Sequence, residues 1–315
     1  MNITTDIFLF TGGIIMLFLG GESLLRGASR LARALGVRPI VIGLTVVAFG
    51  TSAPEFVVCV IAAFKGSSDI VIGNIVGSNI ANIGLILGIA AVIRPITIHM
   101  KIIKVEVPLM ILLSIALYAV SLNLGLGRIE GAFLLSCLIA FTLYSYRAAM
   151  RESLLVKEEY KEFIGDNTSR LRQVAFIIAG LLLLTAGARL IVDSAITIAT
   201  ALGISEVVIS IGAVAVGTSL PELATSIVAA LRKESDIIVG NIVGSNIFNV
   251  GMLGLVSLVK PVAVNPELLR FEYPAMVLFS LLALPVMMTG HRVNRAEGIF
   301  LLILYSAFIA ALFVI

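Results

Sequence analysis

Charged residues are scarce in this sequence: Asp, Glu, Lys and Arg together make up only 13% of its 315 residues, and there is no tryptophan. A soluble domain carries about 25% charged residues, so the composition excludes an ordinary soluble protein. Hydrophobic residues make up 59% of the chain, and the mean hydropathy is +1.12. Apolar runs of about 20 residues recur throughout, and each can cross a hydrocarbon core about 30 Å thick. Because the runs are continuous rather than alternating, we expect a helical membrane protein rather than a β-barrel.

Cysteine and histidine are equally scarce, with two of each. Cys59 and Cys137 both lie within apolar runs, which indicates small core residues rather than a disulfide. His99 and His291 lie far apart at the ends of apolar runs, so they form no metal-ligand pattern. We expect no cofactor and no nucleic-acid partner. We also expect no enzymatic activity, because no His or Lys lies near the acidic residues of the apolar runs to form a nucleophile–base set.

Ten apolar runs predict ten transmembrane helices, five in each half of the chain. They span residues 7–25, 40–64, 70–93, 105–122, 129–146, 174–198, 207–231, 237–259, 273–288 and 298–315. One sizeable polar segment separates the two halves. We therefore expect an all-α integral membrane protein with a five-helix repeat at residues 1–146, a linker at 147–173 and a second five-helix repeat at 174–315.

The two halves contain an internal repeat with an offset of 167 residues. Residues 43–84 align with residues 210–251 without a gap, and 22 of the 42 aligned positions are identical. Because each repeat has an odd number of spans, the second must enter the membrane from the opposite side. The repeats are therefore predicted to be inverted, an arrangement that is common in secondary transporters.

The distribution of Lys and Arg predicts the orientation of the chain. With the N-terminus outside, 17 of the 22 basic residues fall on the inner side. The five that fall in the outer half are Lys65, Arg128, Arg189, Lys260 and Arg270. We therefore expect a multi-pass protein of the plasma membrane with both termini outside and a cytoplasmic linker.

Each repeat has the motif Gly-Thr-Ser-x-Pro-Glu inside an apolar run, at residues 50–55 and 217–222. A proline inside a helix removes one backbone hydrogen bond and clashes with the carbonyl four residues earlier. We therefore expect broken helices with freed carbonyls at Gly50 and Gly217. Together with two hydroxyls and a carboxylate, these carbonyls are hard oxygen ligands of the kind that Ca²⁺, Mg²⁺ or Na⁺ prefers.

The glutamates of these motifs, Glu55 and Glu222, are predicted to lie near the membrane centre. A charged side chain there costs about 2.5–3.5 kcal/mol on insertion scales. Arg189 is the only basic residue near the apolar runs that offers a partner, and it lies near a helix end. A permeant cation held between the two glutamates fits this pattern better than the alternative, a hinge proline followed by a helix-end glutamate.

A second repeated motif, GNIVGSN, carries neutral oxygen atoms at helical spacing. One stripe on each helix is formed by Asn74, Ser78 and Asn82 and by Asn241, Ser245 and Asn249. We expect the serines and the last asparagine of each stripe to bind ions, and Asn74, Asn79 and their equivalents either to bind ions or to brace the broken helices. Asp69 and Asp236 begin these helices after Ser68 and Ser235, so we expect them to belong to helix caps outside the site.

The paired motifs GTSAPE…GNIVGSNIANIG and GTSLPE…GNIVGSNIFNVG resemble the two α-repeats of the sodium/calcium exchanger branch of the calcium/cation antiporter superfamily. The resemblance implies that segments 2, 3, 7 and 8 form a central group of cation sites. It implies that segments 1 and 6 are long, tilted helices that slide across this core. The implied ligands are Glu55 and Glu222 for Ca²⁺ and Na⁺, Ser52, Ser78, Ser219 and Ser245 for Na⁺, the backbone of Thr51, Thr218, Ala48 and Ala215, and Asn82 and Asn249 in the middle.

One departure from the family pattern bears on the choice of ions. Some relatives have an aspartate where this chain has Asn249, so only two acidic ligands remain here, which balance one Ca²⁺ and argue against a K⁺ requirement. Proton-coupled relatives usually have a further acid in the GN-containing helix, and this chain has none. We therefore expect a monomeric Na⁺/Ca²⁺ antiporter with alternating access in the lipid bilayer. The alternatives are a Ca²⁺/H⁺ antiporter and a passive cation channel.

Overall fold

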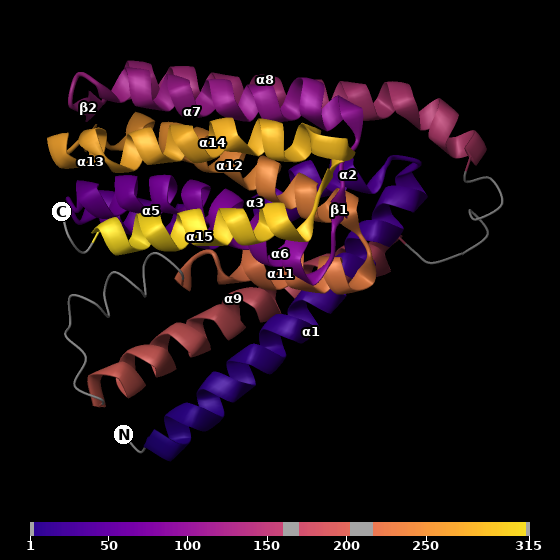
Figure 1. Cartoon of the computed structure of the whole chain (residues 1–315), viewed down its shortest axis with the longest axis horizontal. Helices are drawn as coiled ribbons and strands as arrows, with labels where there is room; N and C mark the ends of the chain where they lie inside the picture. Colours follow the sequence, from indigo (N-terminus) through magenta and orange to yellow (C-terminus); the bar gives the residue numbers. More distant parts are fainter. Residues whose placement is uncertain (1–2, 160–169, 202–216, 313–315) are drawn as a thin grey trace.

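The structure is a computed structural model that describes residues 3–159, 170–201 and 217–312. Most of its helices lie side by side in one bundle, and two long helices cross the others obliquely (Figure 1). These two are α1 (Ile3–Leu35) and α9 (Arg170–Ala201), the first helix of each repeat. The described residues therefore form a largely helical bundle crossed by an oblique pair of long helices.

Within the described residues, nine helices are long and apolar enough to cross a membrane. They span Thr5–Leu35, Pro39–Phe64, Ser68–Ile93, Ile102–Ser121, Arg128–Met150, Arg170–Ala201, Ser235–Val259, Pro266–His291 and Arg295–Leu312. They correspond to nine of the ten predicted spans. The remaining span, predicted at 207–231, lies partly outside the described residues, and its described part is α11 (Leu220–Arg232).

Several spans are interrupted rather than continuous. The second consists of α2 (Pro39–Ile42), the π-helix η1 (Gly43–Val47), α3 (Ala48–Thr51) and α4 (Ala53–Phe64). The third consists of α5 (Ser68–Ala81), the π-helix η2 (Asn82–Leu87) and α6 (Gly88–Ile93), and the fourth of the π-helix η3 (Ile102–Glu106) and α7 (Val107–Ser121). In the second repeat follow α12 (Ser235–Val259), α13 (Pro266–Arg270), α14 (Glu272–Met288), the short 3₁₀ helix η4 (Thr289–His291) and α15 (Arg295–Leu312).

The fifth span, α8 (Arg128–Glu159), extends beyond its predicted end at residue 146. The added stretch is rich in Ala, Arg, Met, Glu, Leu and Lys, which are strong helix formers. Since α9 begins at Arg170, the segment predicted as a linker is helical at both of its ends. Residues 160–169 between them lie outside the described residues.

Helices α5 and α12, the GNIVGSN helices of the two repeats, form the centre of the bundle. In the spans that contain them, 78% and 83% of the most apolar stretch is buried, against at most 50% in the other described spans. Asn79 of α5 bonds Asn249 of α12, and Asn82 bonds Asn246, so the chain numbers run in opposite directions along the contact. Because these helices are equivalent in sequence, their antiparallel contact confirms that the repeats are inverted.

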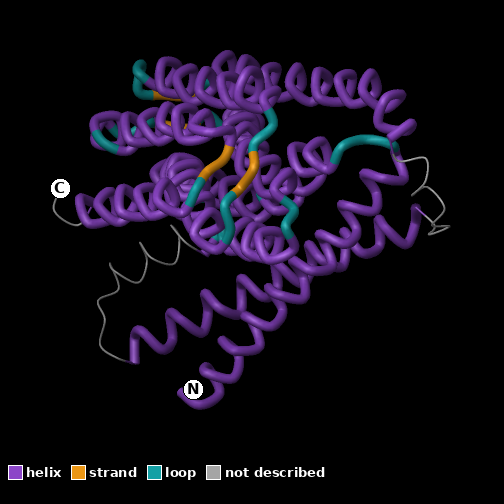
Figure 2. The backbone as a smooth tube through the Cα atoms, turned by 45° about the vertical axis from the view of Figure 1, so that its right-hand side comes forward, coloured by secondary structure: helices purple, strands orange, loops and turns teal. Residues whose placement is uncertain are grey.

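The helix pair α1 and α9 is packed tightly through glycine. A Cβ atom on Gly13 would lie 2.9 Å from the Gly187 carbonyl oxygen, and one on Gly20 would lie 2.9 Å from that of Gly180. Glycines seven residues apart lie on one helix face, so the two backbones approach closely along several turns. Both tube and ribbon views show the pair crossing the bundle together (Figures 1 and 2).

Two short antiparallel ladders join the repeats. Strand β1 (Ile96–Thr97) pairs with β4 (Arg292–Val293), and β2 (Gly125–Leu126) pairs with β3 (Val262–Ala263). Figure 2 shows short strand segments between the helices. The sequence did not predict these strands, because two residues are too few to show an alternating pattern.

The prediction that Ser68 and Ser235 precede the central helices as part of their caps is wrong. Both serines are the first helical residues, and no side chain caps either helix. Their hydroxyls instead accept hydrogen bonds from the backbone N–H groups of Ala263 and Thr97, each at 3.3 Å. These serines therefore fasten the loop strands of the opposite repeat to the central helices.

Candidate cation site

The helix that carries each Pro-Glu motif is broken at its serine. Helix α3 ends at Thr51, Ser52 has φ −83° and ψ 2°, and α4 begins at Ala53. In the second repeat, Ser219 has φ −87° and ψ 5° directly before α11. The proline two residues later has no N–H to offer the preceding turn, so the break follows from the sequence. The predicted interruption is present in both repeats.

The two motifs meet across the pseudo-symmetry axis through serine–glutamate hydrogen bonds. The Ser52 hydroxyl donates to Glu222 Oε1 at 3.1 Å, and the Ser219 hydroxyl donates to Glu55 Oε1 at 3.4 Å. Glu55 is 0% exposed and Glu222 is 1% exposed. Ser219 also lies 3.1 Å from the hydroxyl oxygen of Ser78 on α5. Residues far apart in the chain therefore form one buried site, to which each repeat contributes half.

Asn74 and Asn241 brace the broken helices. Asn74 Nδ2 donates to the Glu55 backbone carbonyl at 3.2 Å, and Asn241 Nδ2 donates to that of Glu222 at 3.5 Å. Sequence reasoning left their role open, and these bonds favour the bracing role.

The threonine hydroxyls of the motifs are engaged by the same asparagines. Thr218 Oγ1 donates to Asn74 Oδ1 at 3.0 Å, and Thr51 Oγ1 donates to Asn241 Oδ1 at 3.0 Å. Because each hydroxyl is directed at an amide oxygen, the side chains of Thr51 and Thr218 hold the two repeats together. The backbone carbonyls of Thr51 and Thr218 stay predicted ion ligands.

A second set of amide bonds orients Asn82 and Asn249. Asn82 Nδ2 donates to Asn246 Oδ1 at 2.8 Å, and Asn249 Nδ2 donates to Asn79 Oδ1 at 3.0 Å. Asn79 and Asn246 each donate to the other's backbone carbonyl at 3.3 Å. Since the nitrogen atoms of Asn82 and Asn249 are directed at these partners, their oxygen atoms remain available.

Among the described residues of the predicted site, five buried oxygen atoms have no hydrogen-bond partner. They are Glu55 Oε2, Glu222 Oε2, Asn82 Oδ1, Asn249 Oδ1 and Ser245 Oγ. A buried polar atom without a partner destabilises a protein by about 1–3 kcal/mol, and a charged one by more. Within the described residues, no basic side chain forms an ion pair with either glutamate. A set of unpaired oxygens that includes two carboxylates matches the chemistry of Na⁺ and Ca²⁺.

The remaining predicted ligands are placed as follows. Ala48 is buried in α3, and its carbonyl already accepts a hydrogen bond from Ser52 N at 3.0 Å. Ala215 lies outside the described residues. Eleven of the twelve predicted residues are described, on α3, α4, α5, η2, α11 and α12 and in the breaks before α4 and α11. Hydrogen bonds bring Ser52, Ser219 and Ser78 together with the two glutamates, while the roles of all eleven as ion ligands stay predictions.

Sequence reasoning missed two side chains that support the site. Cys59 Sγ accepts from Asn74 at 3.3 Å, and Ser226 Oγ accepts from Asn241 at 3.4 Å. Both lie four residues after the motif glutamate and occupy equivalent positions in the repeats. That equivalence was the signal that could have identified them.

The fold and the site define an integral membrane protein of inverted repeats with a buried oxygen-lined centre. A family model described as sodium/calcium exchanger protein matches residues 5–147 and 172–314, one match in each repeat. The chain therefore belongs to the sodium/calcium exchanger family.

Individual relatives match nearly the whole chain. It is 33% identical to the sodium/calcium exchanger MaX1 of Methanosarcina acetivorans, with 99% of this chain and 100% of the relative covered. It is 37% identical to the putative antiporter CaxA of Alkalimonas amylolytica, with 96% of each covered. Among solved structures, it is similar to the sodium–calcium exchanger NCX_Mj soaked with 10 mM Na⁺ and zero Ca²⁺, with a TM-score of 0.84, 34% identity and coverage of 99% and 100%.

Proposed function

We propose that this protein exchanges Na⁺ for Ca²⁺ across the membrane by alternating access. The observation that carries the proposal is the set of buried oxygens without partners, which includes Glu55 Oε2 and Glu222 Oε2. The two carboxylates neutralise one Ca²⁺, and the serine and asparagine oxygens add neutral ligands around it. The names of the relatives support the same pair of ions.

The fluxes of Na⁺ and Ca²⁺ are coupled because both ions bind the same two carboxylates. Glu55 and Glu222 bind either Ca²⁺ or Na⁺, because two carboxylates cannot balance both sets of charges at once. Each half of the exchange cycle therefore carries one kind of ion, and Na⁺ moving down its gradient drives Ca²⁺ the other way. Transport takes place in the plasma membrane, with both termini outside and the linker inside, and one chain is sufficient for it.

Transport by purified protein in liposomes tests this function. We expect an outward Na⁺ gradient to drive uptake of ⁴⁵Ca²⁺, and Glu55→Gln or Glu222→Gln to reduce the uptake at least 100-fold. Each substitution keeps the shape of the side chain and removes half of the site's charge. Glu267→Gln is the matched control, because Glu267 is exposed outside the site, and it should retain wild-type uptake.

Three results would contradict the proposal. Uptake driven by a pH gradient without Na⁺ would indicate Ca²⁺/H⁺ exchange, and uptake without either gradient would indicate a channel. Full exchange by Glu55→Gln would show that the ions bind elsewhere.

A further inference from the structure

The two repeats differ in how the first helix of one repeat covers the second span of the other. Ala224 and Val228 of α11 are 8% and 2% exposed, and α1 packs against this helix. A Cβ on Gly21 of α1 would lie only 3.0 Å from Val228 Cγ2. The equivalent residues of α4, Val57 and Ile61, are 53% and 50% exposed. The end of the bundle where α1 covers α11 is therefore closed, while its counterpart at the opposite end is uncovered.

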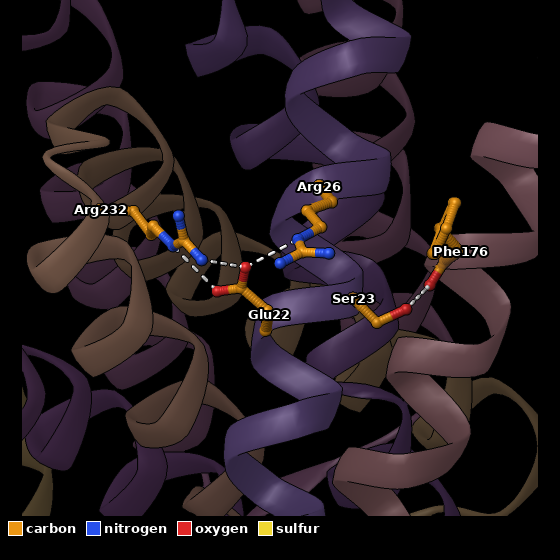
Figure 3. A network of polar contacts seen from close by, with 5 residues as sticks. All are labelled: Glu22, Ser23, Arg26, Phe176 and Arg232. Carbon is orange, nitrogen blue, oxygen red and sulfur yellow. Dashed lines mark hydrogen bonds and ion pairs between the residues drawn. The ribbon is translucent and has the colours of Figure 1, made fainter. Parts of the chain in front are cut away.

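A charged contact lies at this closed end. Glu22 of α1 accepts hydrogen bonds from Arg232 of α11 through both Nε, at 3.0 Å, and Nη2 (Figure 3). Arg26, one turn further along α1, donates from Nε to the same carboxylate at 2.7 Å. The Glu22 side chain is only 12% exposed. The side chains of Arg26 and Arg232 are each 55% exposed, so solvent weakens their contacts with Glu22 in part. Charge-assisted bonds from two guanidinium groups to one largely buried carboxylate are still stronger than a single exposed ion pair.

Two neighbouring hydrogen bonds reinforce this contact. Ser29 Oγ donates to Glu234 Oε1 at 3.2 Å, which joins α1 to the segment after α11. Ser23 Oγ donates to the Phe176 carbonyl of α9 at 2.8 Å (Figure 3). Glu22 therefore joins the α1–α9 pair, as one packed unit, to the core helix α11.

Among the described residues, the opposite end shows no equivalent ion pair. With the offset of 167 residues, Glu22 corresponds to Arg189 and Arg232 corresponds to Lys65. The residue that would face Lys65 after closure of that end is therefore a second cation, and the nearest carboxylate on α9, Asp193, lies one turn away. An ion pair thus favours closure at one end, whereas closure of the other end would bring two like charges together.

We propose that the ion pair between Glu22 and Arg232, called the latch below, keeps closed the end of the bundle where α1 covers α11. The latch thereby sets the resting conformation of the exchanger. This inference rests on the proposed alternating access and adds to it the residues that bias its two states. Glu22 and Arg232 are positioning residues, because neither touches the transported ions. Opening of this end requires α1 to leave α11, which breaks the ion pair and exposes Val228.

The accessibility of Val228 tests the latch without any transport measurement. Val228→Cys is introduced together with Cys137→Ser, since the native Cys59 is buried and Cys137 is half-buried. In purified protein, we expect Glu22→Gln or Arg232→Gln to raise the rate of modification by a water-soluble thiol reagent about five- to tenfold. The reversed pair Glu22→Arg with Arg232→Glu should restore slow modification in an Arg26→Gln background, because Arg26 would otherwise repel the new arginine at position 22. Arg30→Gln, on the same helix, is the matched control and should leave the rate unchanged.

An independent variant adds an attraction at the opposite end. Lys65→Glu gives Arg189 a carboxylate partner. The state in which the opposite end, at α4, is closed should therefore become more populated. Modification of Ile61→Cys should then slow about five- to tenfold, while modification of Val228→Cys should accelerate.

Each result decides between the alternatives. Equal rates in Glu22→Gln and Arg30→Gln, or no rescue by the reversed pair, would overturn the latch. If Lys65→Glu leaves both rates unchanged, closure does not depend on these charges. If the rates change as expected but the wild type shows no Na⁺-driven Ca²⁺ transport, the proposed function fails while the latch stands.

Discussion

At the scale of residues, the site depends on which polar atoms have a hydrogen-bond partner and which have none. Asn74 and Asn241 fix the backbone after each break, and their oxygens accept from the threonines of the opposite repeat. The glutamates, in contrast, each keep one oxygen without a partner. Bracing groups and ion ligands are therefore separated within the same short motif.

Pro54 tests whether the helix break itself is needed. Pro54→Ala supplies an N–H that can bond the Gly50 carbonyl, so the helix becomes continuous and the carbonyl is no longer available. We expect Na⁺-driven Ca²⁺ uptake to fall at least tenfold without loss of thermal stability in detergent.

Pro285→Ala provides the control for that experiment, because Pro285 lies inside α14 away from the cation site. It should leave uptake at the wild-type level. Equal uptake by Pro54→Ala and the wild type would show that the freed carbonyl has no role in transport.

The helix breaks and most candidate site residues could be predicted from the sequence, because the motif occurs twice. Proline, two hydroxyls and a glutamate in a fixed order predicted the break, and the second copy made chance improbable. The partners of Asn79 and Asn246 were not predictable, because each lies 167 residues away on the opposite repeat. Ser68 and Ser235 matched a capping pattern, but loop N–H groups from the opposite repeat compete for their hydroxyls.

At the scale of elements, α1 and α9 form one packed unit held by glycines. Gly20 is the clearest contact: a Cβ there would lie 2.8 Å from Leu184 N and 2.9 Å from the Gly180 oxygen, both backbone atoms that cannot rotate away. The pair therefore moves together across the bundle in the proposed transport cycle.

Gly20→Ala is expected to push the two helices apart. Overpacking of this kind typically destabilises a protein by about 1–3 kcal/mol, which thermal unfolding in detergent would detect. Gly12→Ala is the matched control on the same helix, because nothing lies within 4 Å of a Cβ there. It should keep or raise stability, since alanine is the better helix former. Equal melting temperatures for both variants would contradict close glycine packing.

The sequence predicted the helices better than it predicted the difference in exposure between equivalent helices of the two repeats. Helices α4 and α11 occupy equivalent positions in the repeats and were predicted as equivalent spans, although α11 has Ala224, Thr225 and Ser226 where α4 has Val57, Val58 and Cys59. Only the structure shows α1 covering Val228 while Ile61 is exposed. The two repeats are related by approximate symmetry, but in this conformation α1 packs against α11 at one end of the bundle. This packing makes the exposure of the two equivalent helices different.

At the scale of the whole molecule, inverted repeats place equivalent motifs at the centre from opposite sides. Neither repeat contains a complete site, because each glutamate accepts from a serine of the other. The uneven distribution of Lys and Arg is the basis of the orientation that we propose for the protein in the membrane.

The proposed orientation can be tested by labelling in intact cells with a membrane-impermeant thiol reagent. In a Cys137→Ser background, we expect Asn123→Cys to be labelled, because its loop faces outward. Met100→Cys should be labelled only after the membrane is permeabilised. Both positions are exposed, so accessibility within the protein does not limit the comparison. The reverse pattern would show that the chain is inserted the other way round.

Competition between the two ions tests the central claim most directly, namely that Na⁺ and Ca²⁺ share Glu55 and Glu222. Equilibrium binding of ⁴⁵Ca²⁺ to the purified protein would be measured as Na⁺ replaces K⁺ at constant ionic strength. We predict that rising Na⁺ displaces all of the bound Ca²⁺, and that Glu55→Gln and Glu222→Gln abolish Ca²⁺ binding. Ca²⁺ that remains bound at saturating Na⁺ would show that the ions occupy separate sites and would contradict this account.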